Sequence, residues 1–199
     1  ALSAFLSKWF DSHAFQAVTT ADFLEFLAAE LPQASEGMDL HAWIEEPGLP
    51  DDAPRTTSPI LQGVDKQREA LLSGTPAAEL DVSDWSTQAW LRFLKAMPTE
   101  AGSAPMPELD AAFSLTAAGN SEILAAWLEL SIRQDYEPSY ERLERFLLDV
   151  GRRKFLSPLY RALMETPAGA ERARSIYSEA RPRYHAVSAQ TLDGIVTKG

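Results

Sequence analysis

Residues 139–164, with the sequence SYERLERFLLDVGRRKFLSPLYRALM, contain two helical patterns joined by a short basic corner. Apolar residues recur at spacings of three and four after Ser139, and Gly151 is expected at the C′ position that ends this helix. The pair Ser157-Pro158 has the form of an N-cap followed by a proline at the first helical position. It predicts that a second helix begins at Pro158. Helices of this length with short connections indicate an all-α fold.

Helical spacing extends over nearly the whole chain, and no segment shows the strict alternation that is typical of a half-buried strand. Thr20 is expected to be the N-cap of one helix, with Thr19 and Asp22 as a capping-box-like pair. Capping residues and prolines divide the chain into about eight to ten helices. We therefore predict an all-α fold in which the helices stack in two layers, as an α-α superhelix of the HEAT or armadillo type. The superhelix is inferred from helix lengths, because the sequence contains no clean repeat.

The composition excludes several kinds of chemistry. The 199 residues include no cysteine, so disulfides, thiolate catalysis and cysteine zinc sites are excluded. The histidines, His13, His41 and His185, lie far apart, and no H-E-x-x-H zinc motif is present. No apolar run approaches the roughly 18 residues of a membrane-spanning helix. The chain starts at Ala1 rather than at methionine, so we expect a fragment or a processed product.

Charge is distributed unevenly along the chain. The formal net charge of −11 disfavours nonspecific binding to nucleic acids or membranes, so neither is expected as a partner. Residues 138–185 nevertheless carry ten basic and six acidic side chains, and Arg152, Arg153 and Lys154 are consecutive in this window. These cations can form a solvated cluster that complements the dipole of the preceding helix, for about 0.3–1 kcal/mol. They can also form a site for a carboxylate or phosphate, and the residues alone leave both interpretations open.

Residues 151–160 (GRRKFLSPLY) resemble the segment G-R-x-K-F-x-x-P-L-[FY] in the C-terminal helical domain of the leukotriene-A4 hydrolase and aminopeptidase B group of zinc aminopeptidases. Further stretches are similar to motifs of that domain and occur in the same order. They are TTADF at 19–23 for T-T-x-D-[WF], WIEEPGLP at 43–50 for W-x-x-x-P-G-L-P, and NSEILAAWL at 120–128 for N-S-E-I-x-x-x-W-L. The resemblance spans about residues 5–190, which is nearly the whole chain.

The resemblance implies a two-layer superhelical domain that follows a zinc-binding catalytic domain. Residues 1–199 are accordingly expected to form the single C-terminal α-helical domain of a larger aminopeptidase, with no catalytic residue, metal ligand or cofactor of its own. Zinc is expected in the catalytic domain, which is absent from this chain. The matching positions imply that Arg152 and Lys154 bind a carboxylate of the substrate. Arg153 occupies the variable position and receives no role.

One position departs from the family pattern. Ala186 follows His185 where relatives often have proline, and this puts the start of the last helix, expected at about 183–193, in doubt.

Two functions from different classes are compatible with these observations. The favoured hypothesis is a non-catalytic domain that completes the substrate cleft of a cytoplasmic aminopeptidase. Its partners are then the catalytic domain of the same polypeptide and a short peptide. The alternative is a free-standing helical-repeat domain that binds another protein. The first hypothesis predicts an exposed docking face, for which the helix with Trp9 and Phe10 is the candidate, although core burial is the favoured interpretation for Trp9.

Overall fold

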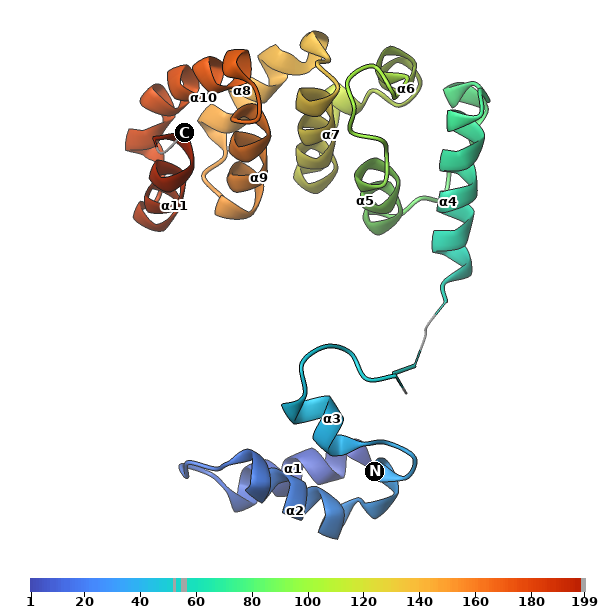
Figure 1. Ribbon diagram of the computed structural model, residues 1–199, viewed down its shortest axis with the longest axis vertical. Helices are drawn as coiled ribbons and strands as arrows, with labels where there is room; N and C mark the ends of the chain where they lie inside the picture. The colour runs from blue at the N-terminus through green and yellow to red at the C-terminus, as the bar shows by residue number, and fades with distance from the viewer. Residues whose placement is uncertain (52, 55–56, 198–199) are drawn as a thin grey trace. The chain divides into compact units, whose positions relative to one another are not determined.

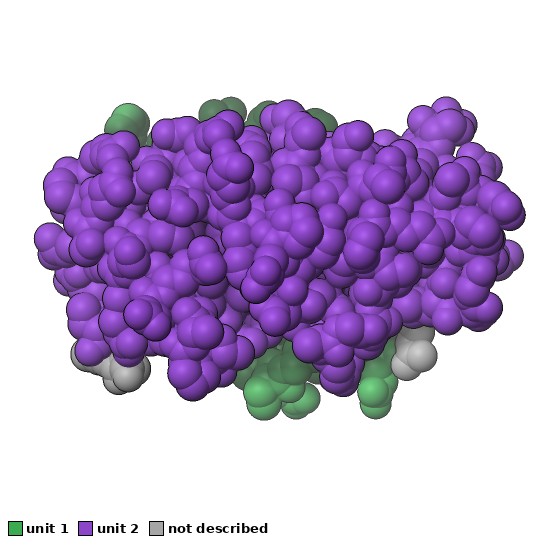
Figure 2. Space-filling view, turned by 90° about the horizontal axis from the view of Figure 1, so that it is seen from above, with its two compact units in different colours: residues 1–56 green, residues 57–199 purple. Residues whose placement is uncertain are grey.

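The computed structural model describes residues 1–51, 53–54 and 57–197, without the side chains of residues 34 and 35. The chain divides into two compact units, residues 1–56 (unit 1) and residues 57–199 (unit 2), which are distinguished by colour in Figure 2. The main core cluster begins at Val64 and therefore belongs to unit 2. That residues 1–199 act as a single domain stays a prediction.

Unit 1 consists of short helices around an aromatic cluster. Trp9 is only 8% exposed, and its ring centroid lies 5.2 Å from those of both Phe23 and Phe26. Phe5 is buried against the same two rings. The elements of unit 1 are α1 (Leu2–Ser12), α2 (Thr20–Glu30), the 3-10 turn η1 (Pro32–Ser35) and α3 (Leu40–Glu45).

Capping residues explain where the helices of unit 1 begin. Thr19 accepts a hydrogen bond from the amide of Asp22, and the carboxylate of Asp22 accepts one from the amide of Thr19. The predicted capping pair is thus confirmed, but the N-cap is Thr19 rather than Thr20. Asp39 caps α3 by accepting hydrogen bonds of 3.1 Å from the amides of His41 and Ala42.

Unit 2 is helical throughout the part that the structure describes, so the predicted all-α class is confirmed. Its α-helices are α4 (Pro59–Leu72), α5 (Thr87–Lys95), α6 (Met106–Phe113), α7 (Ser121–Arg133), α8 (Tyr140–Asp149), α9 (Arg153–Leu163), α10 (Pro167–Ala180) and α11 (Ala186–Val196). Short 3-10 turns join them: η2 (Ala77–Glu79), η3 (Leu115–Ala117), η4 (Glu137–Ser139) and η5 (Arg181–Arg183).

The α-helices of unit 2 form two layers of a superhelix (Figure 1). In one layer α5 packs against α7, α7 against α9, and α9 against α11. Helices α6, α8 and α10 lie along the other side of this row, and α10 contacts both α8 and α9. Alternation between the layers lets each helix bury one apolar face, which is how stacked helical pairs form a continuous core.

Hydrogen bonds link the amino-terminal ends of neighbouring helices in the first layer. The side-chain amide of Asn120, the N-cap of α7, donates to the hydroxyl of Thr87 at the start of α5 over 3.0 Å. The hydroxyl of Ser188 in the first turn of α11 donates over 3.0 Å to the carbonyl of Gly151, which directly precedes Arg152, the N-cap of α9. Parallel helices that are joined at their starts gather their positive dipole ends at one edge of the layer.

A chain of polar contacts runs through the core of unit 2 beside α7. The indole of Trp127, which is fully buried, donates over 2.9 Å to the hydroxyl of Thr116. This hydroxyl in turn donates over 2.7 Å to Asp110, which also accepts from the hydroxyl of Tyr136. The tryptophan of the NSEILAAWL stretch is therefore a core residue whose only polar atom has a partner.

Two predicted helix starts are wrong. Helix α9 begins at Arg153 rather than at Pro158, and Pro158 lies inside it. The last helix begins at Ala186 rather than near residue 183, because η5 (Arg181–Arg183) forms a separate 3-10 turn. The ring of His185 caps this helix by accepting a hydrogen bond from Val187, and Ala186 takes the first helical position, where proline is also favoured.

Candidate functional site

The basic corner lies at the amino-terminal end of α9. Arg152 is the N-cap residue, and Arg153 and Lys154 form the start of the first turn. All three side chains belong to exposed residues. Cations at this position oppose the positive end of the dipole of α9, so this helix does not explain their presence. A concentration of positive charge that the local helix disfavours is consistent with an anion site.

Lys154 is already paired with an acidic residue from the neighbouring helix. Its ammonium lies 2.6 and 2.7 Å from the two carboxylate oxygens of Glu122, in the first turn of α7. The Lys154 side chain remains 56% exposed and that of Glu122 is 30% exposed. Two of the three ammonium protons can therefore be donated to Glu122, which leaves one for another acceptor.

Arg152 has no such counter-ion. Its guanidinium carbon lies 5.5 Å from the ring centroid of Phe155, and the ammonium of Lys154 lies 5.5 Å from the same centroid. Within the residues that the structure describes, the guanidinium has no ion pair or hydrogen bond. Phe155 is only 8% exposed, so a fixed ring supports both cations.

Helices α5, α7 and α9 enclose a cavity beside these residues. It has a volume of about 60 Å³, and Glu122, Lys154 and Phe155 are among the residues that line it. A groove of about 340 Å³ between the same helices shares Lys95 and Pro158 with this cavity. The paired Lys154 thus faces a hollow to which Lys95 adds a further cation and Glu129 a further carboxylate.

Buried tyrosines support the helix that carries the corner. The hydroxyls of Tyr160 on α9 and Tyr184 lie 3.2 Å apart, and Tyr184 also donates to the carbonyl of Leu147 on α8. Burial and the contact with Tyr184 raise the pKa of Tyr160, so this hydroxyl stays neutral at physiological pH. These contacts join α9 to α8 behind the corner and fix its position.

Sequence reasoning identified Arg152 and Lys154 but missed Glu122 and Phe155. Both missed residues lie in the stretches that carry the family resemblance, NSEILAAWL and GRRKFLSPLY. The pairing of Glu122 with Lys154 depends on how α7 and α9 pack, which sequence spacing does not reveal, whereas Phe155 contacts Arg152 and Lys154 within the start of α9. The structure brings the acidic residue of one motif onto the lysine of the other.

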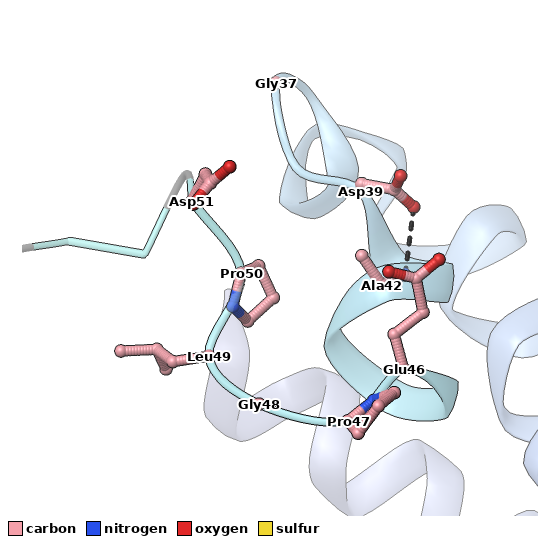
Figure 3. A pocket seen from close by; sticks show the side chains of 9 residues that line it. All are labelled: Gly37, Asp39, Ala42, Glu46, Pro47, Gly48, Leu49, Pro50 and Asp51. Carbon is pink, nitrogen blue, oxygen red and sulfur yellow. Dashed lines mark hydrogen bonds between the residues drawn. The ribbon is translucent and has the colours of Figure 1, made fainter.

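A second, separate pocket lies in unit 1, on the WIEEPGLP stretch (Figure 3). It has a volume of about 490 Å³, and the residues that line it fall between Gly37 and Asp51. Asp39, Glu46 and Asp51 contribute carboxylates to its wall, and none of the lining residues is basic. This pocket therefore does not have the chemistry of a carboxylate or phosphate site.

The described residues do not fit a zinc site. They include no group of three or more histidine, cysteine, aspartate or glutamate side chains that could hold a metal ion. His41 instead pairs with Glu45 over 3.1 Å, and His13 contacts the carbonyl of Trp9 at 2.9 Å. Among the described helices, none is long and apolar enough to cross a membrane.

Comparison with curated proteins finds similar chains among aminopeptidases. Aminopeptidase B of Mus musculus is 24% identical over 96% of this chain, which corresponds to 31% of that protein. Leucine aminopeptidase 2-1 of Scheffersomyces stipitis is 26% identical over 92% of this chain, or 32% of that protein. The chain thus spans about a third of the length of the curated relatives that it matches.

Comparison with solved structures finds the same fold in native yeast LTA4 hydrolase, with a TM-score of 0.75. The two are 20% identical, and the match covers 98% of this chain and 35% of the yeast chain. The family described as "Leukotriene A4 hydrolase, C-terminal" matches residues 85–196, a range that includes the basic corner. Because this match covers more than half of the sequence, the chain belongs to the leukotriene A4 hydrolase C-terminal family.

Proposed function

We propose that this chain is the non-catalytic C-terminal part of a zinc aminopeptidase that resembles leukotriene A4 hydrolase. In this proposal the chain completes the substrate cleft, and Arg152 and Lys154 bind the C-terminal carboxylate of a short peptide. The observation that carries the proposal is the guanidinium of Arg152, which is exposed and supported by Phe155. Within the described residues it has no acidic partner.

A carboxylate is the ligand that this arrangement favours. A guanidinium presents two parallel N–H groups that match the two oxygens of a carboxylate. The joined amino-terminal ends of α5, α7, α9 and α11 add positive dipole ends on the same edge of the layer. Arg152 therefore has the geometry and the surrounding potential to bind a peptide terminus.

A fixed carboxylate site would also select for peptide length. An extended tripeptide spans at most about 10–11 Å, so a clamp at a set distance from the reacting bond suits peptides of that size. Binding energy from the remote terminus then aligns the peptide for reaction. We place the reacting groups and the zinc in the part of the polypeptide outside this chain, because the described residues offer no metal site.

The relatives also weigh on the choice between the two hypotheses. In each aminopeptidase compared above, the matched segment is a third of a longer protein. This supports the hypothesis that the chain is part of a longer enzyme, rather than the alternative that it is a free-standing interaction domain. The catalytic domain is then the partner within the polypeptide, and a cytoplasmic location stays a prediction.

The proposal is tested with Arg152→Ala in the full-length protein. Loss of a charge-assisted hydrogen bond costs about 1.5–3 kcal/mol, so kcat/KM for a tripeptide with a free carboxylate should fall roughly 10- to 150-fold. The same peptide with a C-terminal amide should be nearly unaffected. Lys154→Ala should have a smaller effect, because Glu122 already occupies that ammonium.

Arg161→Ala is the matched control, since Arg161 is an exposed arginine on the same helix. It should change kcat/KM for neither peptide. If Arg152→Ala lowers kcat/KM equally for the peptide with a free carboxylate and for the peptide amide, the basic corner does not bind a carboxylate.

A further inference from the structure

The ion pair between Glu122 and Lys154 is not needed to hold α7 and α9 together. Exposed ion pairs typically contribute only about 0–1 kcal/mol to stability. Helices α7 and α9 are already held together by buried apolar residues, including Leu128 and Leu159, both of which are fully buried. The packing of these two helices therefore does not require this pair.

The geometry of the pair places a carboxylate where a ligand carboxylate would bind. Both oxygens of Glu122 lie within 2.7 Å of the Lys154 ammonium. An incoming carboxylate must share or replace this contact, and it experiences repulsion from the negative charge of Glu122 as it approaches. Lys154 and Glu122 together carry no net charge, so the attraction that remains comes from Arg152 and the neighbouring exposed Arg153.

We propose that Glu122 is a specificity-determining residue, an internal counter-ion that occupies Lys154 and limits how tightly the corner binds a peptide carboxylate. This inference rests on the proposed function of Arg152 and Lys154. Glu122 touches neither the reacting bond nor a metal in this account, and it acts through Lys154. Removing its charge should free the lysine and strengthen the preference for peptides with a free C-terminus.

The test measures kcat/KM of the full-length protein for tri-alanine and for tri-alanine amide. Glu122→Gln keeps an oxygen that can accept from Lys154 but removes the charge. We expect the ratio of the carboxylate to the amide value to rise roughly 3- to 10-fold, which is the scale of one ionic contact at a half-exposed site. In the presence of Lys154→Met, Glu122→Gln should raise the ratio less, because it then removes only the repulsion between Glu122 and the peptide carboxylate and frees no lysine.

Glu141→Gln is the matched control. Glu141 also lies in the first turn of a helix, α8, and pairs with an arginine, Arg145, at 3.1 Å. Glu141→Gln removes one negative charge from the first turn of a helix, as Glu122→Gln does, so any general effect of that charge on kcat/KM appears in both variants. Thermal unfolding verifies that the variants are folded. If Glu122→Gln folds poorly, Glu122→Ala is used in its place, and the same rise in the ratio is expected.

The possible outcomes distinguish a failure of the role of Glu122 from a failure of the proposed carboxylate site at Arg152 and Lys154. An unchanged or lower ratio in Glu122→Gln would overturn the inference. So would a rise that is just as large in the presence of Lys154→Met, or an equal rise in Glu141→Gln. If these results occur while Arg152→Ala still reduces the ratio, the proposed carboxylate site stands and only the assignment of Glu122 fails. If Arg152→Ala leaves the ratio unchanged, the proposed site itself fails.

Discussion

Glu122 and Lys154 are 32 positions apart in the sequence, yet the carboxylate of the first contacts the ammonium of the second at 2.6 and 2.7 Å. Each residue lies in the first turn of its helix, so the pair brings the starts of α7 and α9 together. The link from Asn120 to Thr87 does the same for α7 and α5. Helices joined in this way run parallel, and their amino-terminal ends form one edge that favours anions.

The first prediction concerns metal binding by the chain alone. Purified residues 1–199 should retain no stoichiometric zinc after dialysis against a chelator, and should hydrolyse no aminoacyl reporter substrate. The reason is that the described residues offer no cluster of three ligands, which a protein zinc site needs. Metal analysis by mass spectrometry measures the zinc content. One tightly held zinc ion per chain would contradict the prediction.

The second prediction concerns the pH dependence of stability. Hydrogen bonds from Arg181, at 2.8 Å, and from Tyr177 lower the pKa of Asp193 to about 2. A folded-state pKa below the ordinary value of 3.8 stabilises the fold above that pH. Asp193→Asn should therefore be less stable than the wild type at pH 6, and the difference should disappear as the pH falls from about 4 to 2.

Urea unfolding at several pH values checks this prediction. Asp84→Asn is the control, because Asp84 is exposed and has no ion pair among the described residues. It removes one negative charge without breaking an interaction. A stability difference for Asp193→Asn that stays constant down to pH 2 would be inconsistent with a lowered pKa of Asp193 in the folded protein.

The third prediction separates two neighbouring residues of α1. Trp9 is 8% exposed whereas Phe10 is 67% exposed. In the isolated chain, Trp9→Ala should lower the free energy of unfolding of unit 1 by about 3–5 kcal/mol, and Phe10→Ser should change it by less than about 0.5 kcal/mol. If Phe10 belongs to a docking face for the catalytic domain, Phe10→Ser should lower the thermal midpoint of the full-length protein only.

Circular dichroism on the isolated chain and on the full-length protein measures both effects. The exposed apolar side chains Leu2 and Leu6 lie on the same helix as Phe10, so Leu2→Ser offers a second variant of the same kind. Identical midpoints for the full-length wild type and both variants would place the docking face elsewhere.

Local sequence signals predicted much of the fold, because capping depends on residues close in sequence. Asp39 and Ser58 accept hydrogen bonds from the first turns of α3 and α4. Ser86 does the same for α5. These helix starts follow from a polar side chain next to an apolar pattern. Trp127 lies on the apolar face of the NSEILAAWL stretch, and it is fully buried.

The start of α9 could not be predicted in the same way. Ser157-Pro158 has the form of a helix start, but residues before it are also helical. Phe155 and Leu156 are buried against the core, and this packing outweighs the local preference of proline for a first turn. The pairing of Glu122 with Lys154 was equally inaccessible, since it depends on how α7 and α9 align within their layer.

Pro158 has a consequence for the exchange of backbone amides with solvent. Because proline has no N–H, it cannot donate to the carbonyl of Lys154, and the first turn of α9 is joined to the rest of the helix by one hydrogen bond fewer. Opening this turn therefore costs less than opening the turn at Tyr160, whose side chain is fully buried. Deuterium should enter the segment that carries the cations first, while the remainder of α9 stays protected.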